Sequence, residues 1–173
     1  MVIKFLATLV IAAQAVSAII LVSLVFRGKL PRLHGFLAHL SLPLAFATAL
    51  VATLGSLYLS EIAGFKPCDL CWFQRIFMYP QAILLGLALL RREMVVICYS
   101  LPLLFIGLAI SLYHNYIVYQ AVTATFCSAI GEISCTQQYI VEYGYVTIPL
   151  MSLTAFLLVI LSLLLAKSRQ AQE

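Results

Sequence analysis

The chain has 173 residues, of which 64% are hydrophobic and only 9% carry a charge. A water-soluble domain of this size needs far more polar surface, so the composition excludes one and indicates a protein that lies largely in lipid. The formal net charge of +4 comes from residues that flank the apolar stretches. It does not form a basic face, and we expect no nucleic-acid partner.

Five apolar stretches are long enough, or nearly so, to cross a membrane. A spanning helix needs about 20 mostly apolar residues at a rise of about 1.5 Å each. The pattern therefore predicts an all-α integral membrane protein with membrane lipid as its surroundings. The predicted spans are Phe5–Phe26, Phe36–Ser60, Trp72–Leu90, Met94–Tyr116 and Thr147–Ala166.

The first stretch has a second interpretation. Lys4, the apolar run after it, and the small residues Ala15 and Ala18 resemble a secretory signal peptide. The apolar run continues through residues 19–26, however, which gives a spanning length. We therefore favour a membrane helix that is retained.

Positive charges predict the orientation of the spans, because Lys and Arg accumulate in cytoplasmic loops. Seven of the ten lie after spans one, three and five, which places the N-terminus outside and the C-terminus inside. These seven are Arg27, Lys29, Arg32, Arg91, Arg92, Lys167 and Arg169.

Cysteine placement agrees with this orientation. Cys68 and Cys71 precede span three, and Cys127 and Cys135 precede span five, so all four fall in predicted outer loops. Disulfides persist outside the cytosol, which is consistent with a multi-pass protein of the bacterial cytoplasmic (inner) membrane. We expect Cys98, near the cytoplasmic end of span four, to be a small buried apolar residue.

The segment from Pro67 to Cys71 is a C-x-x-C motif at the start of a helix. Haem attachment needs a His after the second Cys, where this chain has Trp72. A thioredoxin-like site needs a βαβ pattern, which the sequence lacks. A redox-active membrane dithiol, a four-cysteine metal site and static disulfides that pin the loops remain open.

Residues next to Cys71 favour redox chemistry. The start of a helix stabilises a thiolate, and Arg75 lies one turn beyond Cys71 on the same face. Arg75 can hold that thiolate and donate a hydrogen bond to a ligand carbonyl, or it can extend to the lipid headgroups. A cation at this depth marks a functional site by default.

Other polar and aromatic residues lie near this pair in the sequence. Gln74 offers a further donor, and Trp72 offers a flat surface suited to a ring. Trp72 and Tyr79 can equally anchor the helix in the aromatic belt, which we prefer for Tyr79. His114, near the outer end of span four, can exchange protons or be a buried, hydrogen-bonded residue.

The second outer loop is the longest polar segment. Cys127 and Cys135 enclose a short stretch that suggests a hairpin, and Tyr139 and Tyr143 predict a short helical segment on the membrane surface. Thr147 is expected to cap span five.

Several segments, in the right order, resemble the DsbB/BdbC family of disulfide bond formation proteins. The likeness covers about residues 40–166, and the short spacing of the loop cysteines resembles the BdbC-type branch. The matching segments are Leu54–Tyr58, Ser60–Glu61, Pro67–Ile76, Met78–Pro80, Gln138–Ile140 and Gly144–Pro149, together with Cys135.

The resemblance implies a four-helix transmembrane bundle over residues 36–166. Residues 1–35 would add an extra N-terminal transmembrane helix and a cytoplasmic loop, and residues 167–173 a cytoplasmic tail. Typical members lack this first span. The sequence leaves open whether it packs on the bundle.

The resemblance also implies four catalytic cysteines. Cys127 and Cys135 would oxidise a thioredoxin-fold partner of the DsbA/BdbD type, with Cys127 taking the mixed disulfide. Electrons would then pass to Cys68 and Cys71, with a transient Cys68–Cys135 bridge as one route.

A quinone, menaquinone or ubiquinone, would bind beside Cys71 with the help of Arg75. His114 matches a histidine near the quinone in this family, and Gln74 and Trp72 are further candidates for the quinone site. The acceptor would come from the membrane quinone pool.

Two alternatives remain. The vitamin K epoxide reductase type has similar chemistry, but its C-x-x-C follows the loop pair, whereas here it comes first. A protein of a different class, a non-enzymatic metal-binding or metal-carrier membrane protein, would use the four thiolates as ligands.

Overall fold

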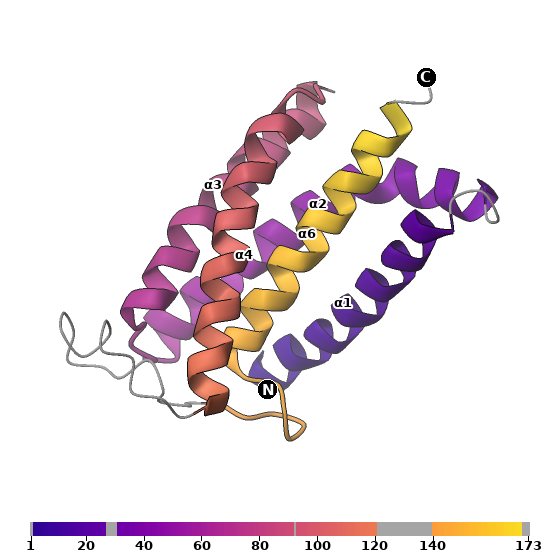
Figure 1. The fold of residues 1–173 in the computed structure, drawn as a ribbon. Helices are drawn as coiled ribbons and strands as arrows, with labels where there is room; N and C mark the ends of the chain where they lie inside the picture. Colours follow the sequence, from indigo (N-terminus) through magenta and orange to yellow (C-terminus); the bar gives the residue numbers. More distant parts are fainter. Residues whose placement is uncertain (1, 27–30, 92, 121–139, 171–173) are drawn as a thin grey trace.

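Figure 1 shows the computed structural model of the chain, which describes residues 2–26, 31–91, 93–120 and 140–170. Five long helices, each long and apolar enough to cross a membrane, make up most of these residues. This confirms the predicted all-α membrane architecture. The helices are α1 (Val2–Val25), α2 (Pro31–Leu57) with its π-helical continuation η1 (Tyr58–Ile62), α3 (Asp69–Arg91), α4 (Val96–Gln120) and α6 (Ile148–Gln170).

Helices α2, α3, α4 and α6 surround a common core of apolar side chains, which we call the bundle core. Helix α1 packs mainly on α6, which lies between α4 and α1 (Figure 1). Ile20 of α1 belongs to a smaller cluster with Ala38 of α2 and Leu158 of α6. The first span therefore packs on the bundle. The bundle core consists of Leu42, Ala45, Ala49, Met78, Leu85, Ala88, Ile97, Leu101, Leu104, Phe156, Val159, Ile160, Leu163 and Ala166.

Outward-facing side chains are largely apolar, as contact with lipid requires. Leu90 and Ile83 of α3 are 82% and 67% exposed. Cys98 is also exposed on α4, so the expected burial of this cysteine is wrong. Its helix presents Cys98 and Tyr99 to the surroundings and buries Ile97 and Ser100 instead.

The chain reaches α6 through a tight turn. Glu142 and Val146 form an antiparallel bridge, and Tyr143 and Gly144 have positive φ angles of 52° and 79°. The predicted surface helix around Tyr143 is therefore wrong, because a left-handed pair of residues reverses the chain there. Tyr139 lies outside the described residues.

Thr147 caps α6, as the sequence predicts. The Leu150 backbone N–H donates to Thr147 Oγ1 at 3.4 Å, and the Met151 N–H donates to the Thr147 carbonyl at 2.9 Å. The starts of α3 and α6 and the end of α4 therefore meet at one end of the bundle, which also holds the beginning of α1 (Figure 1).

Candidate functional site

Cys68 and Cys71 lie together at the start of α3. The helix begins at Asp69, and the Cys68 carbonyl accepts a hydrogen bond from the Trp72 N–H at 3.1 Å, so Cys68 occupies the N-cap position. The two sulfur atoms are 3.3 Å apart, within hydrogen-bonding distance. The pair is thus described as two thiols.

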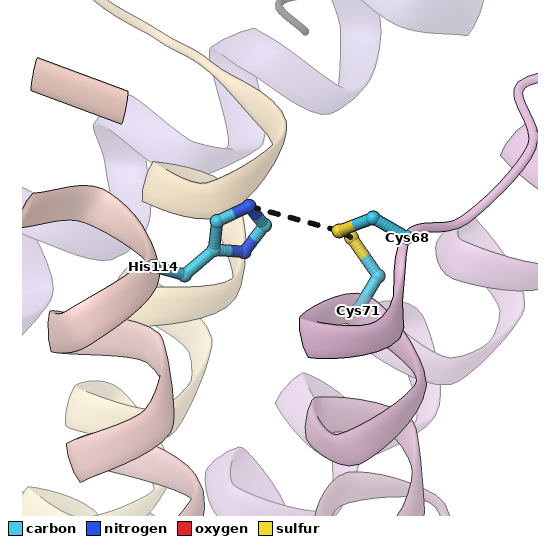
Figure 2. Close-up of side chains that lie close together, drawn as sticks. All are labelled: Cys68, Cys71 and His114. Atoms are coloured by element: carbon cyan, nitrogen blue, oxygen red, sulfur yellow. Dashed lines mark hydrogen bonds between the residues drawn. The ribbon is translucent and has the colours of Figure 1, made fainter. Parts of the chain in front are cut away.

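His114 of α4, the helix that packs next to α3, faces this pair. Its Nε2 atom lies 3.9 Å from the Cys68 sulfur (Figure 2). The side-chain Nε2 of Gln74 lies 3.2 Å from His114 Nδ1, and both residues are buried. This second contact holds the imidazole ring so that its other nitrogen points at the sulfur.

These contacts make Cys68 acidic. Its hydrogen bond with the Cys71 side chain lowers the pKa of Cys68 most, and the hydrogen bond and charge of His114 and the Cys71 backbone N–H lower it further. Burial opposes them. The pKa of Cys68 falls from 9.0 to about 4. Cys68 therefore carries the thiolate of the reduced pair, because an N-cap sulfur can accept helix N–H groups and receive the favourable helix dipole.

The sequence predicted the thiolate on Cys71, whereas the contacts in the structure favour it on Cys68. Which of the two sulfur atoms reacts with an electron acceptor stays a prediction. Cys71 is half-buried beside Cys68, and both line the cavity described below.

Arg75 is fixed by Ser56 of α2. Its Nε donates to Ser56 Oγ at 2.9 Å, and its Nη2 donates to the Ser56 carbonyl at 3.0 Å. The guanidinium carbon lies 5.2 Å from the centroid of the Trp72 ring, a cation–π distance. Tyr79 also donates to Ser56 Oγ, at 3.3 Å. Among the described residues, Ser56 takes two of the five guanidinium N–H donors, which leaves others to meet a ligand.

A cavity of about 340 Å³ opens beside these residues, and we call it the redox cavity. Its wall from α3 follows one helical face through Cys71, Gln74, Arg75, Met78 and Tyr79. Cys68 and His114 complete this polar side. The opposite walls come from α1, α2 and α6 and are mostly apolar; they include Leu6, Leu9, Val10, Ala13, Ala47, Val51, Ala52, Gly55, Ala155 and Leu158.

The structure brings five of the eight predicted site residues to this cavity: Cys68, Cys71, Gln74, Arg75 and His114. Trp72 is 55% exposed and stacks near Arg75 instead of lining the cavity. Cys127 and Cys135 lie outside the described residues. Sequence reasoning gave no role to Ser56 and expected Tyr79 only as a belt anchor, although the Leu54–Tyr58 motif contains Ser56.

The same pair and histidine can also hold a metal ion. The ligand atoms of Cys68, Cys71 and His114 all lie within 4.8 Å of one another. Two thiolates and an imidazole are zinc ligands, and the Gln74 contact with the second imidazole nitrogen resembles the outer support of such sites.

Comparison with known proteins places this geometry in a family. The family model "Disulfide bond formation protein DsbB" matches residues 38–166. "Probable disulfide formation protein C 1" of Bacillus anthracis is 47% identical over 113 residues, which cover 65% of this chain and 81% of that protein. "Disulfide bond formation protein C" of Bacillus subtilis is 39% identical over 128 residues, 74% of this chain and 93% of that protein. No solved structure is significantly similar. Because the family model spans most of the chain, including α3, α4 and α6 with the cysteine pair and His114, the chain belongs to the DsbB family of disulfide bond formation proteins.

Proposed function

We propose that this protein oxidises the dithiol of a thioredoxin-fold partner outside the membrane and delivers the electrons to a membrane quinone. Membership in the DsbB family implies thiol–disulfide oxidation in a membrane. The observation that carries the finer proposal is the redox cavity, where the two adjacent cysteine sulfur atoms and a fixed guanidinium share one wall opposite an apolar surface.

The redox cavity fits a quinone. Its polar side can meet ring carbonyls with the N–H groups of Arg75 and Gln74, while its apolar walls suit a hydrocarbon tail. When bound, a quinone accepts two electrons and two protons and becomes a quinol. Arg75 is oriented by Ser56, and Cys68 and Cys71 present their sulfur atoms to the same space.

The cysteines exchange disulfides in two steps. A disulfide between Cys127 and Cys135 oxidises the partner dithiol and is itself reduced, and a disulfide between Cys68 and Cys71 then reoxidises the loop pair. Cys68 and Cys71 become a dithiol in the second step. Each exchange breaks one S–S bond and forms another, so two electrons and two protons move with each.

His114 and Cys71 stabilise the reduced pair. The Cys71 sulfur and His114 Nε2, the latter 3.9 Å from the Cys68 sulfur, are both placed to hydrogen-bond to a Cys68 thiolate. Reoxidation joins the two sulfur atoms, which start only 3.3 Å apart. Little movement of α3 is then needed.

Turnover tests this proposal. Purified protein, a reduced thioredoxin-fold substrate and menaquinone or ubiquinone should give one quinone reduced for each dithiol oxidised. Cys71→Ser should lower the rate by at least about 1000-fold, because the pair can no longer form a disulfide. Cys98→Ser is the matched control, since Cys98 lies on the outer surface of α4; it should keep the wild-type rate. Full turnover in Cys71→Ser would exclude the assigned chemistry.

We also propose that the cysteine-pair end of the bundle faces the outside of the cell, in the bacterial cytoplasmic membrane. The concentration of Lys and Arg in the segments at the other end supports this orientation. In intact cells treated with a reductant, a membrane-impermeant thiol reagent should modify the protein, and Cys98→Ser should be modified equally. Labelling only after the membrane is broken would reverse the orientation.

A second candidate function is metal binding, favoured by the clustered ligand atoms of Cys68, Cys71 and His114. Metal analysis of protein purified without reductant separates the two candidates. Stoichiometric zinc together with thiols that do not react with added quinone would favour a metal carrier. Metal-free protein whose thiols disappear when quinone is added supports the oxidase.

A further inference from the structure

Helix α1 forms one wall of the redox cavity, although it precedes the segment that matches the family, residues 38–166. Leu6, Leu9, Val10 and Ala13 contribute this wall. Their spacing of three and four residues puts them on one face of the helix. The neighbouring Ala12 does not line the cavity and is exposed.

Polar contacts fix α1 in this position. Gln14 uses both ends of its amide: Nε2 donates to Thr154 Oγ1 at 3.4 Å, and Oε1 accepts from the Tyr145 hydroxyl at 3.1 Å. Thr8 Oγ1 lies 3.1 Å from the Tyr143 hydroxyl. A polar side chain within a membrane span is costly unless it is bonded inside the protein, so these contacts indicate a helix built to stay on the bundle.

Helix α1 also approaches α2 closely at the outer end of the cavity. A Cβ atom added to Gly55 would lie 3.3 Å from Leu6 Cδ2. The glycine therefore gives room for Leu6, and α1 closes the cavity next to Ser56 and Arg75. The wall that α1 adds is entirely apolar, whereas the groups able to meet ring carbonyls lie across from it on α3 and α4.

We propose that α1 is the tail-binding wall of the quinone cavity, with Val10 and Ala13 as specificity-determining residues for the isoprenoid tail. The inference rests on the proposed function, since it assigns a place to the tail of that quinone. The ring lies on the polar side at Arg75 and Gln74. The tail runs along α1, where its burial between α1, α2 and α6 adds affinity that the ring alone does not have.

Binding measurements with two probes test this role. Menadione has the menaquinone ring without a tail, and a menaquinone with a short isoprenoid tail adds only the tail. Trp72 is the single tryptophan of the chain and lies beside Arg75, so quenching of its fluorescence reports binding without turnover. In the wild-type protein, the tailed probe should bind more tightly than menadione.

Ala13→Phe and Ala12→Phe form a matched pair of variants, because the two alanines are neighbours but only Ala13 lines the cavity. Ala13→Phe should weaken binding of the tailed probe about tenfold by filling the tail space, and should leave menadione binding within about twofold. Ala12→Phe should change neither. Val10→Phe, one turn away on the same wall, should repeat the Ala13→Phe result and guards against misfolding of a single variant.

The outcomes separate this inference from the proposed function. Equal weakening of both probes, or identical behaviour of Ala13→Phe and Ala12→Phe, would overturn the role of α1 while quinone turnover in the wild type upheld the oxidase. Failure of either probe to quench Trp72, together with no quinone turnover, would remove the proposed function and this inference with it.

Discussion

The bundle core and the redox cavity are both built from small and apolar side chains, but only one of them is filled. In the core, Phe156 is fully buried and its ring lies where a Cβ on Gly107 would be, and Phe46 crowds Gly86 in the same way. In the cavity, small residues such as Ala13 and Ala47 border open space of about 340 Å³.

This difference indicates how a membrane protein keeps a cavity open. Lipid is as apolar as the side chains, so burial of apolar surface does little to drive helices together, and close packing and internal hydrogen bonds hold them. Contacts of a ring with a glycine join α4 to α6, at Gly107 and Phe156, and α3 to α2, at Gly86 and Phe46. Helix α1, which forms one wall of the cavity, is attached by the bonds of Thr8 and Gln14 and by the apolar contacts of Ile20.

A substitution that disrupts the bundle core should have the largest effect on the stability of the protein. Gly107→Ala places a methyl group against the Phe156 ring, and we expect a loss of about 1–3 kcal/mol in the free energy of unfolding. Thermal unfolding in detergent measures this. Gly35→Ala on α2 is the control, because nothing lies within 4 Å of its added Cβ; it should cost nothing or stabilise slightly.

The reactivity of Cys68 should survive Gly107→Ala, since neither Gly107 nor Phe156 lines the cavity. Reduced Gly107→Ala protein should therefore react with iodoacetamide at the wild-type rate below its melting temperature. If reactivity changed together with stability, the bundle core and the redox cavity would be mechanically coupled and not independent.

The sequence predicted the helices of the bundle core better than it predicted the redox cavity. Spans follow from the length of apolar runs, a local property, and all five predicted spans are helices here. The cavity depends on how closely helices that are distant in sequence pack against one another, and no single apolar stretch determines that packing. The polar side chains Thr8 and Gln14 within the first apolar run are the signal in the sequence that α1 packs against polar groups.

The position of the thiolate shows how sensitive a site is to a helix boundary. The third span was expected to begin near Cys71, which would give that sulfur the helix dipole. Because α3 begins at Asp69, Cys68 takes the N-cap instead. Helix boundaries are set by a few weak contacts and are hard to predict to the residue. His114, far away in sequence, contacts Cys68 and also favours the thiolate on that sulfur.

Removing the imidazole of His114 should change the redox cavity and leave the bundle core unaffected. His114→Phe deletes a hydrogen bond and a charge that lower the pKa of Cys68, so this pKa should rise towards its ordinary value. The alkylation rate of Cys68 follows its thiolate fraction. In the reduced wild-type protein the rate should be constant well above pH 4, and His114→Phe should be about tenfold slower near pH 5 and recover at higher pH.

Stability of the reduced protein should change with pH in the same direction. A thiol whose pKa is lowered in the folded state stabilises the fold fully above its unfolded pKa, and the stabilisation is lost as pH falls through the folded value. The melting temperature should thus decline from about pH 9 towards pH 4 through this group, and less steeply in His114→Phe. His39→Phe, at an exposed position on α2, is the control. Equal slopes in all three proteins would mean that His114 does not act on Cys68.

The smallest expected effect concerns the support of Arg75. Ser56→Ala removes the hydroxyl that accepts from Arg75 Nε and Tyr79, but keeps the backbone carbonyl that accepts from Nη2. Loss of one neutral hydrogen-bond partner costs about 1 kcal/mol, so quinone affinity should fall about fivefold if Arg75 binds the ring. Trp72 fluorescence measures the affinity.

The same variant reports on the guanidinium before any ligand is added. Arg75 lies over the Trp72 ring, so a guanidinium released from Ser56 should shift the emission of Trp72 in the quinone-free protein. Ser60→Ala is the matched control, because among the described residues the Ser60 hydroxyl bonds only to nearby residues of its own chain segment, Leu57 and Glu61. An emission shift without a change in affinity would mean that Ser56 positions Arg75 but that the quinone ring is held by other groups, with Gln74 the next side chain along the same helical face.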